Sequence, residues 1–210
     1  MKILELFAGT GSVGNVAKEL GHVVVSLDRD MEADIRTDIM DWDYVAAFRP
    51  GDFDFIWASP PCTEYSRAKT TGIRKIEEAN EVVKRTLEII SYLEPKYFVI
   101  ENPQTGLLKS QEFMSSLAFD DVDYCKYGLS YRKRTRLWNN IETWEPRPLC
   151  RKDCGSMTED GRKHVETAQR LPSRRREAWG ENYRVIPREE LYKVPASLIS
   201  EILTSIPPIG

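Results

Sequence analysis

A cysteine that could act chemically stands behind two prolines at the end of an apolar run. Residues 53–58 read FDFIWA, and Ser59, Pro60, Pro61 and Cys62 follow directly. Such a run is typical of a buried strand, so the thiol would project from a strand end on a stiff loop. A cysteine there is a nucleophile, a metal ligand, half of a disulfide or an inert buried side chain.

A glycine-rich turn, FAGTGSVG at residues 7–14, follows the first apolar run and opens a helical pattern. Gly9 and Gly11 let the backbone approach a ligand closely, and the helix start offers unbonded N–H groups. Such turns serve dinucleotides or S-adenosylmethionine (AdoMet), and the spacing with Gly14 suits both. Asp28 ends the next apolar run, the usual place for a carboxylate that holds ribose hydroxyls. Asp38 is either a partner for an adenine amino group or an ordinary turn residue.

Four motifs occur in order within residues 1–140: LELFAGTGSVG, SPPC, ENP at residues 101–103 and YRKRTRLW at residues 131–138. In this order the chain resembles the C5-cytosine-specific DNA methyltransferase family, in a compact, phage-like form. One motif alone is a weak signal, whereas four with sensible spacing are a strong one. Amino-group methyltransferases have an aromatic residue where this chain has Cys62, which favours carbon 5 of cytosine as the target.

The resemblance implies a role for each motif residue. Cys62 would be the nucleophile, because carbon 5 reacts only after a thiolate has added to C6. Glu101 would contact N3 and the amine of the base, while Arg134 and Arg136 would neutralise phosphate or base oxygen and lower the thiol pKa. The residues implied for AdoMet are Phe7, Gly9, Gly11, Asp28, Asp38, Ile39 and Pro60. Those implied for the substrate are Ser59, Pro61, Asn102, Pro103 and Arg132, the last standing where the family has glutamine.

The implied reaction moves a methyl group from AdoMet to C5 of a cytosine that is flipped out of a DNA duplex or single-stranded. Three alternatives stay open at this point. The substrate could be transfer RNA, the donor could be an altered AdoMet that carries a modified group, or the protein could be a silent DNA-binding relative. Silent relatives generally lack the cysteine or the glutamate, and both are present here.

The remaining three cysteines and one of the two histidines form a second candidate site. Three residues separate Cys150 from Cys154, His164 follows, and Cys125 lies upstream. Three thiols and an imidazole are the ligands of a small structural zinc site. Zinc is therefore a hypothesis for these residues, and their occurrence without a metal is the alternative.

Strand-like and helix-like stretches alternate through the first hundred residues and must position these motifs. They predict an α/β, doubly wound, Rossmann-like fold with a mainly parallel sheet, in which ligands bind at the carboxyl ends of strands. The expected strands are residues 2–7, 22–27, 53–58 and 97–100, and the expected helices are 12–20, 77–93 and 196–205. A strand or hairpin is expected within residues 125–140, and residues 144–183 should be rich in loops.

The chain should divide into an AdoMet-binding catalytic core at residues 1–140 and a short irregular insert at residues 141–190. A C-terminal helix within residues 191–210 should pack back on the core. The insert is short for target recognition, so a separate specificity partner is a further hypothesis.

Composition narrows the class of protein. The 210 residues are 41% hydrophobic and 30% charged, as in ordinary globular proteins, and four cysteines are too few for a secreted disulfide framework. An intracellular protein outside the membrane is expected. The net charge of −3 argues against bulk electrostatic binding of nucleic acid. Basic segments at residues 132–136 and 170–176 suit a defined groove for DNA, with Arg174 and Arg175 as candidate contacts in the second, or else a solvated surface.

Overall fold

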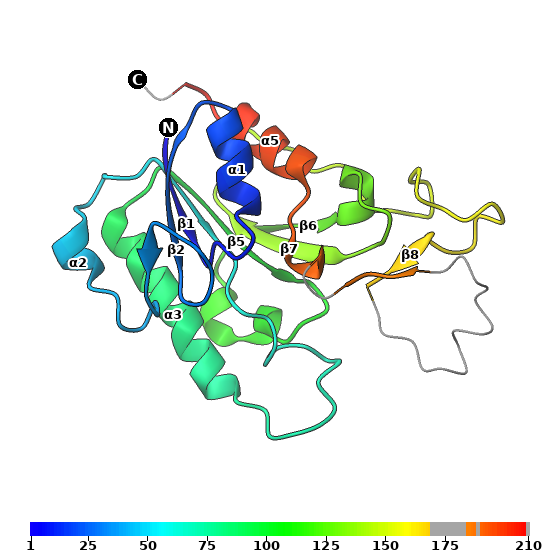
Figure 1. Cartoon of the computed structure of the whole chain (residues 1–210), viewed down its shortest axis with the longest axis horizontal. Helices are drawn as coiled ribbons and strands as arrows, with labels where there is room; N and C mark the ends of the chain where they lie inside the picture. Colours follow the sequence, from blue (N-terminus) through cyan, green and yellow to red (C-terminus); the bar gives the residue numbers. More distant parts are fainter. Residues whose placement is uncertain (169–183, 188–189, 209–210) are drawn as a thin grey trace.

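The structure is a computed structural model that describes residues 1–168, 184–187 and 190–208. Seven strands form one sheet in the order β3-β2-β1-β4-β5-β7-β6 (Figure 1). They are β1 (Lys2–Leu6), β2 (Val23–Asp28), β3 (Ile35–Arg36), β4 (Phe55–Ala58), β5 (Tyr97–Pro103), β6 (Phe119–Asp123) and β7 (Arg134–Asn139). The first five are parallel, β7 runs antiparallel to β5, and β6 runs antiparallel to β7. The predicted doubly wound, mainly parallel sheet is confirmed.

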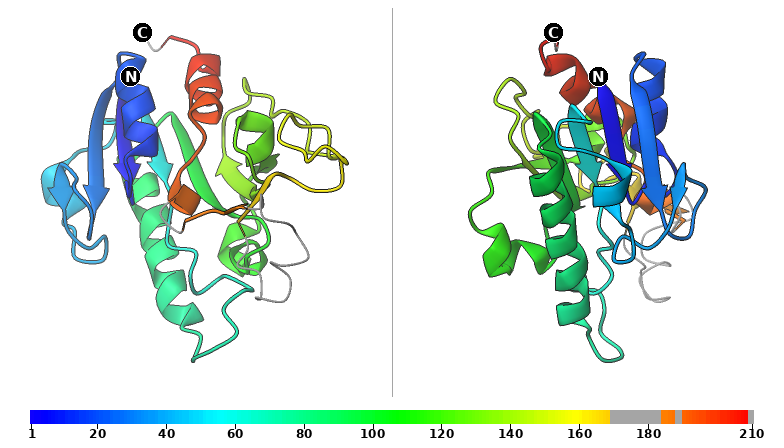
Figure 2. Two further views of the ribbon diagram at one scale, coloured as in Figure 1. Left: turned by 45° about the vertical axis from the view of Figure 1, so that its right-hand side comes forward. Right: turned by 90° about the vertical axis from the view of Figure 1, so that its left-hand side faces the viewer.

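Helices cover both faces of this sheet (Figures 1 and 2). On one face lie α1 (Ser12–Glu19) and α5 (Ala196–Ser205), which contact each other. On the other lie α3 (Ile76–Leu93) and the short α2 (Tyr44–Ala47). No helix in the described ranges is long and apolar enough to cross a membrane.

Strand β4 shows why three layers form. Phe55 and Trp57 belong to the core under α1 and α5, whereas Ile56 and Ala58 belong to the core under α3. All four side chains are fully buried. Burial of each large apolar side chain contributes about 1.5–3 kcal/mol, so a strand that is apolar on both faces is stable only between two layers of helix.

Helix α3 illustrates how well the helical periodicity locates an element. Val83 and Ile90 face the core, as expected from their spacing, and the helix begins one residue before the expected start. It ends at Leu93 because Glu94 is left-handed, with φ of 48°, and Pro95 cannot continue a helix.

Beyond β5, a strand or hairpin was expected within residues 125–140, and the structure has a single strand there. Tyr124–Tyr127 form a 3-10 helix, η3, and only β7 falls inside residues 125–140. The partner strand β6 lies upstream and reads FDDVD, so its three aspartates hide the apolar alternation.

The loop-rich character expected after residue 144 is confirmed as far as residue 168. One strand there, β8 (Glu166–Thr167), pairs with β9 (Arg184–Val185) apart from the main sheet. The remaining short elements are the 3-10 helices η1 (Leu108–Ser110), η2 (Glu112–Met114) and η4 (Glu190–Tyr192).

Candidate active site

The glycine-rich turn joins β1 to α1 in an unusual backbone conformation. Phe7, Gly9 and Gly11 all have positive φ, at 59°, 54° and 69°. Glycine accepts this conformation easily, whereas Phe7 is strained in it, and such strain gathers at functional sites. The turn is closed by a bond from the Gly11 N–H to the Ala8 carbonyl at 2.8 Å. The backbone expected to approach a cofactor is therefore held in one shape.

A buried glutamate beneath the turn was not expected from the sequence. Glu5 is 3% exposed, and its carboxylate accepts hydrogen bonds from the N–H groups of Val13 and Gly14 at 3.2 and 3.0 Å. Burial raises the pKa of Glu5 to about 7, outweighing these two bonds, which favour the ionised form. A Cβ on Gly14 would lie 2.5 Å from Glu5 Oε2, so a larger residue there would force the Glu5 carboxylate to move away from the turn. The single acidic residue in the run KILELF, flanked by apolar residues on both sides, was the available signal.

Asp28 lies at the carboxyl end of β2, as expected, and holds the loops around it. Its carboxylate accepts from the N–H of Gly9 at 2.8 Å, and from those of Asp30 and Met31 at 2.8 and 2.9 Å. Two carboxylate oxygens can accept about four hydrogen bonds. Asp28 therefore joins the glycine turn to the end of β2 and keeps acceptor capacity for a ligand.

Asp38 has the local contacts of a turn residue. Its Oδ1 accepts from the Met40 N–H at 2.9 Å, and its Oδ2 accepts from Arg29 Nη1 at 3.2 Å. The neighbouring Ile39 is 3% exposed and packs in the core under α3. Asp38 and Ile39 both follow β3, and these contacts are those of ordinary turn and core residues.

Cys62 lies on the loop that leaves the carboxyl end of β4, and it is not part of a disulfide. Its side chain is partly exposed, whereas Pro60 is buried and Pro61 is exposed. The amide of Asn102 donates to the Pro60 carbonyl at 2.9 Å. Because Asn102 follows Glu101 on β5, this bond ties the Cys62 loop to the strand of the predicted acid.

The rest of that loop is also anchored. Ser59 Oγ accepts from the indole N–H of Trp57 at 3.1 Å, and Tyr65 is fully buried with its hydroxyl on Asn80 at 2.8 Å. Further along, the Arg74 guanidinium donates to the carbonyls of Glu64, Ser66 and Lys69. Pro103, the last residue of β5, accepts from the Gly106 N–H at 2.9 Å. The thiol is thus carried by a well-tethered loop.

Glu101 is 7% exposed and points to the face of α1 and α5. Its Oε1 accepts from the Tyr124 hydroxyl at 2.9 Å and lies 3.5 Å from Lys133 Nζ. Neither Tyr124 nor Lys133 was predicted from the sequence, because contacts between side chains on different strands depend on register.

Arg134 and Arg136 lie in different surroundings from Glu101. Arg134 binds Asp123 through Nε and Nη2 at 3.0 and 2.7 Å, and Arg136 binds Asp121 in the same way at 2.7 and 3.0 Å. In the sheet register Arg136 pairs with Asn102, whereas Glu101 pairs with Leu137. Since side chains alternate along a strand, both arginines leave the sheet on the face opposite Glu101.

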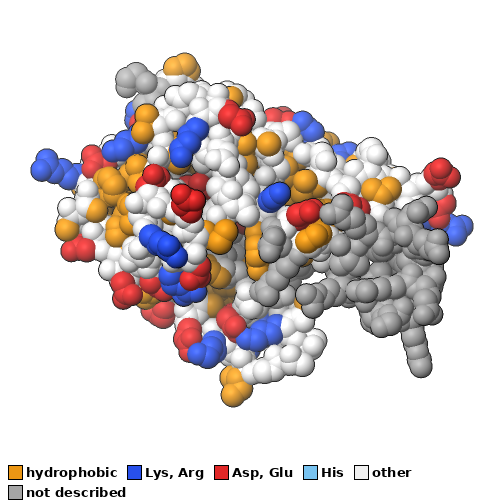
Figure 3. All heavy atoms as spheres, viewed as in Figure 1, with side chains coloured by type: hydrophobic (Ala, Val, Ile, Leu, Met, Phe, Trp, Pro, Cys, Tyr) orange, Lys and Arg blue, Asp and Glu red, His pale blue; other side chains and the backbone are white. Residues whose placement is uncertain are grey.

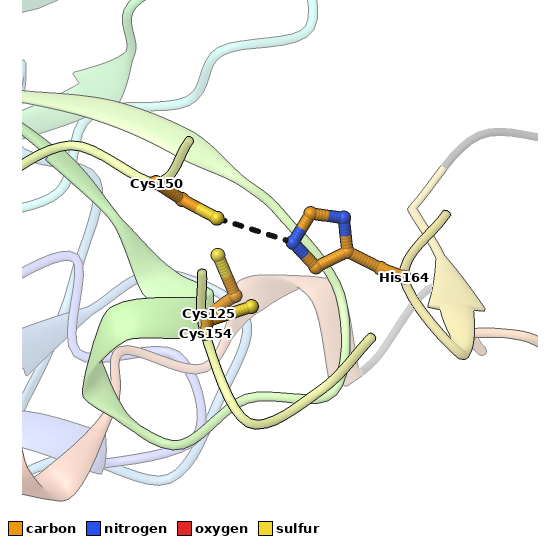
Figure 4. Close-up of side chains that lie close together, drawn as sticks. All are labelled: Cys125, Cys150, Cys154 and His164. Carbon is orange, nitrogen blue, oxygen red and sulfur yellow. Dashed lines mark hydrogen bonds between the residues drawn. The ribbon is translucent and has the colours of Figure 1, made fainter. Parts of the chain in front are cut away.

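The four predicted metal ligands come together (Figure 4). Cys125, Cys150, Cys154 and His164 have ligand atoms that all lie within 4.8 Å of one another, and Cys150 Sγ is 3.5 Å from His164 Nε2. Burial lowers the pKa of His164, and the positive charge of Arg132 lowers it further, which favours the neutral imidazole that binds metals. Arg132 itself is exposed.

The expected DNA contacts Arg174 and Arg175 lie outside the described residues. On the face shown in Figure 3, acidic and basic side chains of the described residues are interspersed. Charge on this face therefore does not mark a DNA path by itself.

Comparison with known proteins identifies relatives. Residues 1–132 match the family described as C-5 cytosine-specific DNA methylase. A Frog virus 3 (isolate Goorha) protein named "Probable DNA (cytosine-5)-methyltransferase" is 36% identical over 97% of this chain and 99% of its own length. The crystal structure of a candidate DNA modification methyltransferase encoded within an E. coli prophage aligns with 71% of this chain at 18% identity and a TM-score of 0.51. This chain covers about half of that solved chain, 52%, and at this identity the likeness concerns the fold alone.

Proposed function

Because the chain belongs to the C-5 cytosine-specific DNA methylase family and is therefore a DNA (cytosine-5)-methyltransferase, we propose that it acts through a covalent bond between Cys62 and C6 of the base, with AdoMet as methyl donor. One observation carries the proposal. The buried Asn102 holds the Cys62 loop against β5, the strand that carries Glu101. A nucleophile and an acid are thereby attached to neighbouring strand ends.

Cys62 is proposed to make C5 nucleophilic by adding to the neighbouring carbon. Its sulfur forms a bond to C6, the electrons of the C5–C6 double bond move toward N3, and the resulting enamine carbon C5 takes the methyl group from AdoMet, which leaves as S-adenosylhomocysteine. Loss of the C5 proton then expels the Cys62 thiolate and restores the ring. An anchored loop suits this step because attack requires the sulfur at a fixed distance and angle from C6.

Glu101 is the residue proposed to donate a proton to N3 as the thiolate adds to C6, so that negative charge does not remain on the ring. Its burial, and the contacts with Tyr124 and Lys133, orient the carboxyl group before a substrate arrives. A preoriented group needs no reorganisation during the reaction. Such preorganisation is the main source of electrostatic catalysis.

The residues proposed to hold AdoMet are those of the glycine turn and β2, chiefly Gly9, Gly11 and Asp28. The positive φ of the turn and the remaining acceptor capacity of Asp28 fit a nucleoside that lies across two strand ends. When bound, AdoMet supplies an electrophilic methyl group on a sulfonium.

For the DNA we propose contacts through Arg134, which is 32% exposed. Asp123 holds its Nε and Nη2, which leaves the Nη1 edge for a phosphate. The target cytosine must leave the duplex or be single-stranded, because C6 is otherwise stacked out of reach.

We also propose one structural zinc ion on Cys125, Cys150, Cys154 and His164. Tetrahedral ligands at about 2.0–2.3 Å from zinc stand roughly 3.3–3.8 Å apart. The Cys150–His164 pair at 3.5 Å meets this, and the whole set lies close to it, within 4.8 Å. Four protein ligands leave no open position for a substrate, so the site is structural. Purification without added zinc should yield about one zinc per chain, lost in Cys150→Ser. Protein without stoichiometric zinc would end this part of the proposal.

The function is tested by transfer of a labelled methyl group from AdoMet to duplex DNA, with transfer RNA as competitor. The wild-type should label DNA, and DNA containing 5-fluorocytosine should trap a covalent adduct that Cys62→Ala cannot form. Full turnover by Cys62→Ala would refute the covalent mechanism, and preferential labelling of RNA would refute the assignment of substrate.

A further inference from the structure

Three consecutive residues at the junction of β6 and η3 contact three different parts of the molecule. Asp123 binds the guanidinium of Arg134 at 2.7 and 3.0 Å. The Tyr124 hydroxyl donates to Glu101 at 2.9 Å, and Cys125 belongs to the metal-binding cluster. One short turn therefore joins the proposed acid, an arginine of the proposed DNA contact and the cluster.

The turn is buried, and a second link attaches it to the cluster. Asp123 and Tyr124 are fully buried, and Cys125 is 4% exposed. The N–H of Cys150, another cluster residue, donates to Asp123 Oδ2 at 3.0 Å. The carboxylate of Asp123 thus lies between Arg134 and the cluster and bonds to both sides.

Lys133 locks the turn to the beginning of β7. Its carbonyl accepts from the Tyr124 N–H at 3.1 Å, and its Nζ lies 4.9 Å from the centre of the Tyr124 ring. The same Nζ is 3.5 Å from Glu101 Oε1 and donates to the Leu191 carbonyl at 3.0 Å. Tyr124 and Lys133 both contact the Glu101 carboxylate, and their backbones are bonded to each other. A shift of the turn would therefore move both contacts of Glu101.

The turn has little internal hydrogen bonding to define its position. η3 is a 3-10 helix of four residues that ends at Gly128, where φ is 98°. Short 3-10 helices have poor hydrogen-bond geometry, so the position of the turn depends on its contacts with Arg134, Lys133 and the cluster. A metal on Cys125 and its three partners would cross-link the turn to residues 150–164 (Figure 4).

We propose that the cluster is the anchor of the active site: a zinc ion there holds the turn Asp123–Cys125, and through it Tyr124 positions Glu101 and Asp123 positions Arg134. This role rests on the proposed function and on the proposed zinc ion. Tyr124 and Asp123 are positioning residues, since they act through other side chains.

The first test compares two tyrosines that make the same kind of bond. Tyr44, also buried, donates to Glu88 at 2.7 Å on the far side of the sheet, so Tyr44→Phe is a matched control. Tyr124→Phe should lower kcat and the rate of trapping on 5-fluorocytosine DNA by about tenfold or more, because a buried carboxylate loses a donor. The KM for AdoMet should match that of Tyr44→Phe, and thermal unfolding should show both variants folded at the assay temperature. Equal kcat in the two variants would overturn the positioning role.

The second test removes the metal from the whole protein and follows amide hydrogen exchange. Metal removal should speed exchange in residues 97–103 and 119–139 while residues 2–19 stay unchanged, and added Zn²⁺ should restore the slow exchange. Bound zinc whose removal changes neither segment would overturn the anchor while leaving the zinc proposal intact. Protein that holds no zinc would overturn both. Wild-type protein inactive on DNA would refute the proposed function, and the exchange measurement would still decide the anchor.

Discussion

The side of the sheet proposed to hold AdoMet, at β1 and β2, and the side proposed to hold the base, at β5 and β7, are here called the cofactor end and the base end, and they are built from different kinds of contact. At the cofactor end, the carboxylates of Glu5 and Asp28 bind backbone N–H groups. At the base end, Glu101 and Arg134 are held by other side chains, Tyr124 and Asp123. A carboxylate bound to backbone shapes a turn, whereas side chains bound to each other fix only each other's position. The cofactor end should therefore lose binding when it is damaged, and the base end should lose catalysis.

The largest effect, a loss of turnover, is expected when Cys62 at the base end is replaced. Cys62→Ala should reduce turnover by about three orders of magnitude or more, because the proposed activation of C5 requires the Cys62 thiolate. AdoMet affinity, measured by calorimetry, should not change. Thr63→Ala, one residue along the same exposed loop, should retain turnover. A Cys62→Ala protein that also failed to bind AdoMet would break the distinction between the two ends.

The next effect concerns stability at the base end. Arg134→Ala leaves the fully buried Asp123 without its counter-charge and should cost about 3 kcal/mol of unfolding free energy in denaturant titrations. Arg136→Ala is the matched control, since its partner Asp121 is 19% exposed and should tolerate the loss better. Equal losses in the two variants would show that burial of the aspartate does not matter.

Glu5, at the cofactor end, should make the free energy of unfolding depend on pH. Its pKa of about 7 in the folded protein exceeds the ordinary value of 4.5 because of burial, so the folded state binds more protons between these values. Its contribution to stability is present below about pH 4.5 and is lost as the pH rises through 7, by about 3 kcal/mol. Denaturant titrations of the wild-type and Glu5→Gln at several pH values measure it. Parallel curves for the two proteins would contradict the prediction.

The smallest effect should be confined to cofactor binding. Asp28→Ala removes the carboxylate that holds Gly9 and should weaken AdoMet binding about tenfold. Asp30→Ala changes an exposed aspartate two residues along and should bind AdoMet as the wild-type does. At saturating AdoMet, adduct formation on 5-fluorocytosine DNA should be unaffected by Asp28→Ala. Slower adduct formation there would show that the two ends are coupled.

The sequence predicted features that depend on local signals better than features that depend on contacts between distant residues. The elements β1, β2, β4, β5, α1, α3 and α5 and the glycine turn were predictable because their signals are local: apolar periodicity, positive-φ glycines and a proline after α3. The gathering of Cys125, Cys150, Cys154 and His164 was also predictable, although metal binding itself remains to be measured. A strand was expected within residues 125–140, where β7 lies, but its partner β6 was not predicted because it carries aspartates that only their arginine partners explain.

The sequence by itself determined the fold class, the family and the loop that carries Cys62, because these depend on motifs and on the order of elements along the chain. Only the tertiary structure decided which side chains meet. The register of β5 against β7 puts Arg134 and Arg136 on the face opposite Glu101 and leaves Tyr124 and Lys133 beside it. A shift of one residue in that register would exchange the two sets, and register depends on packing between strands distant in sequence.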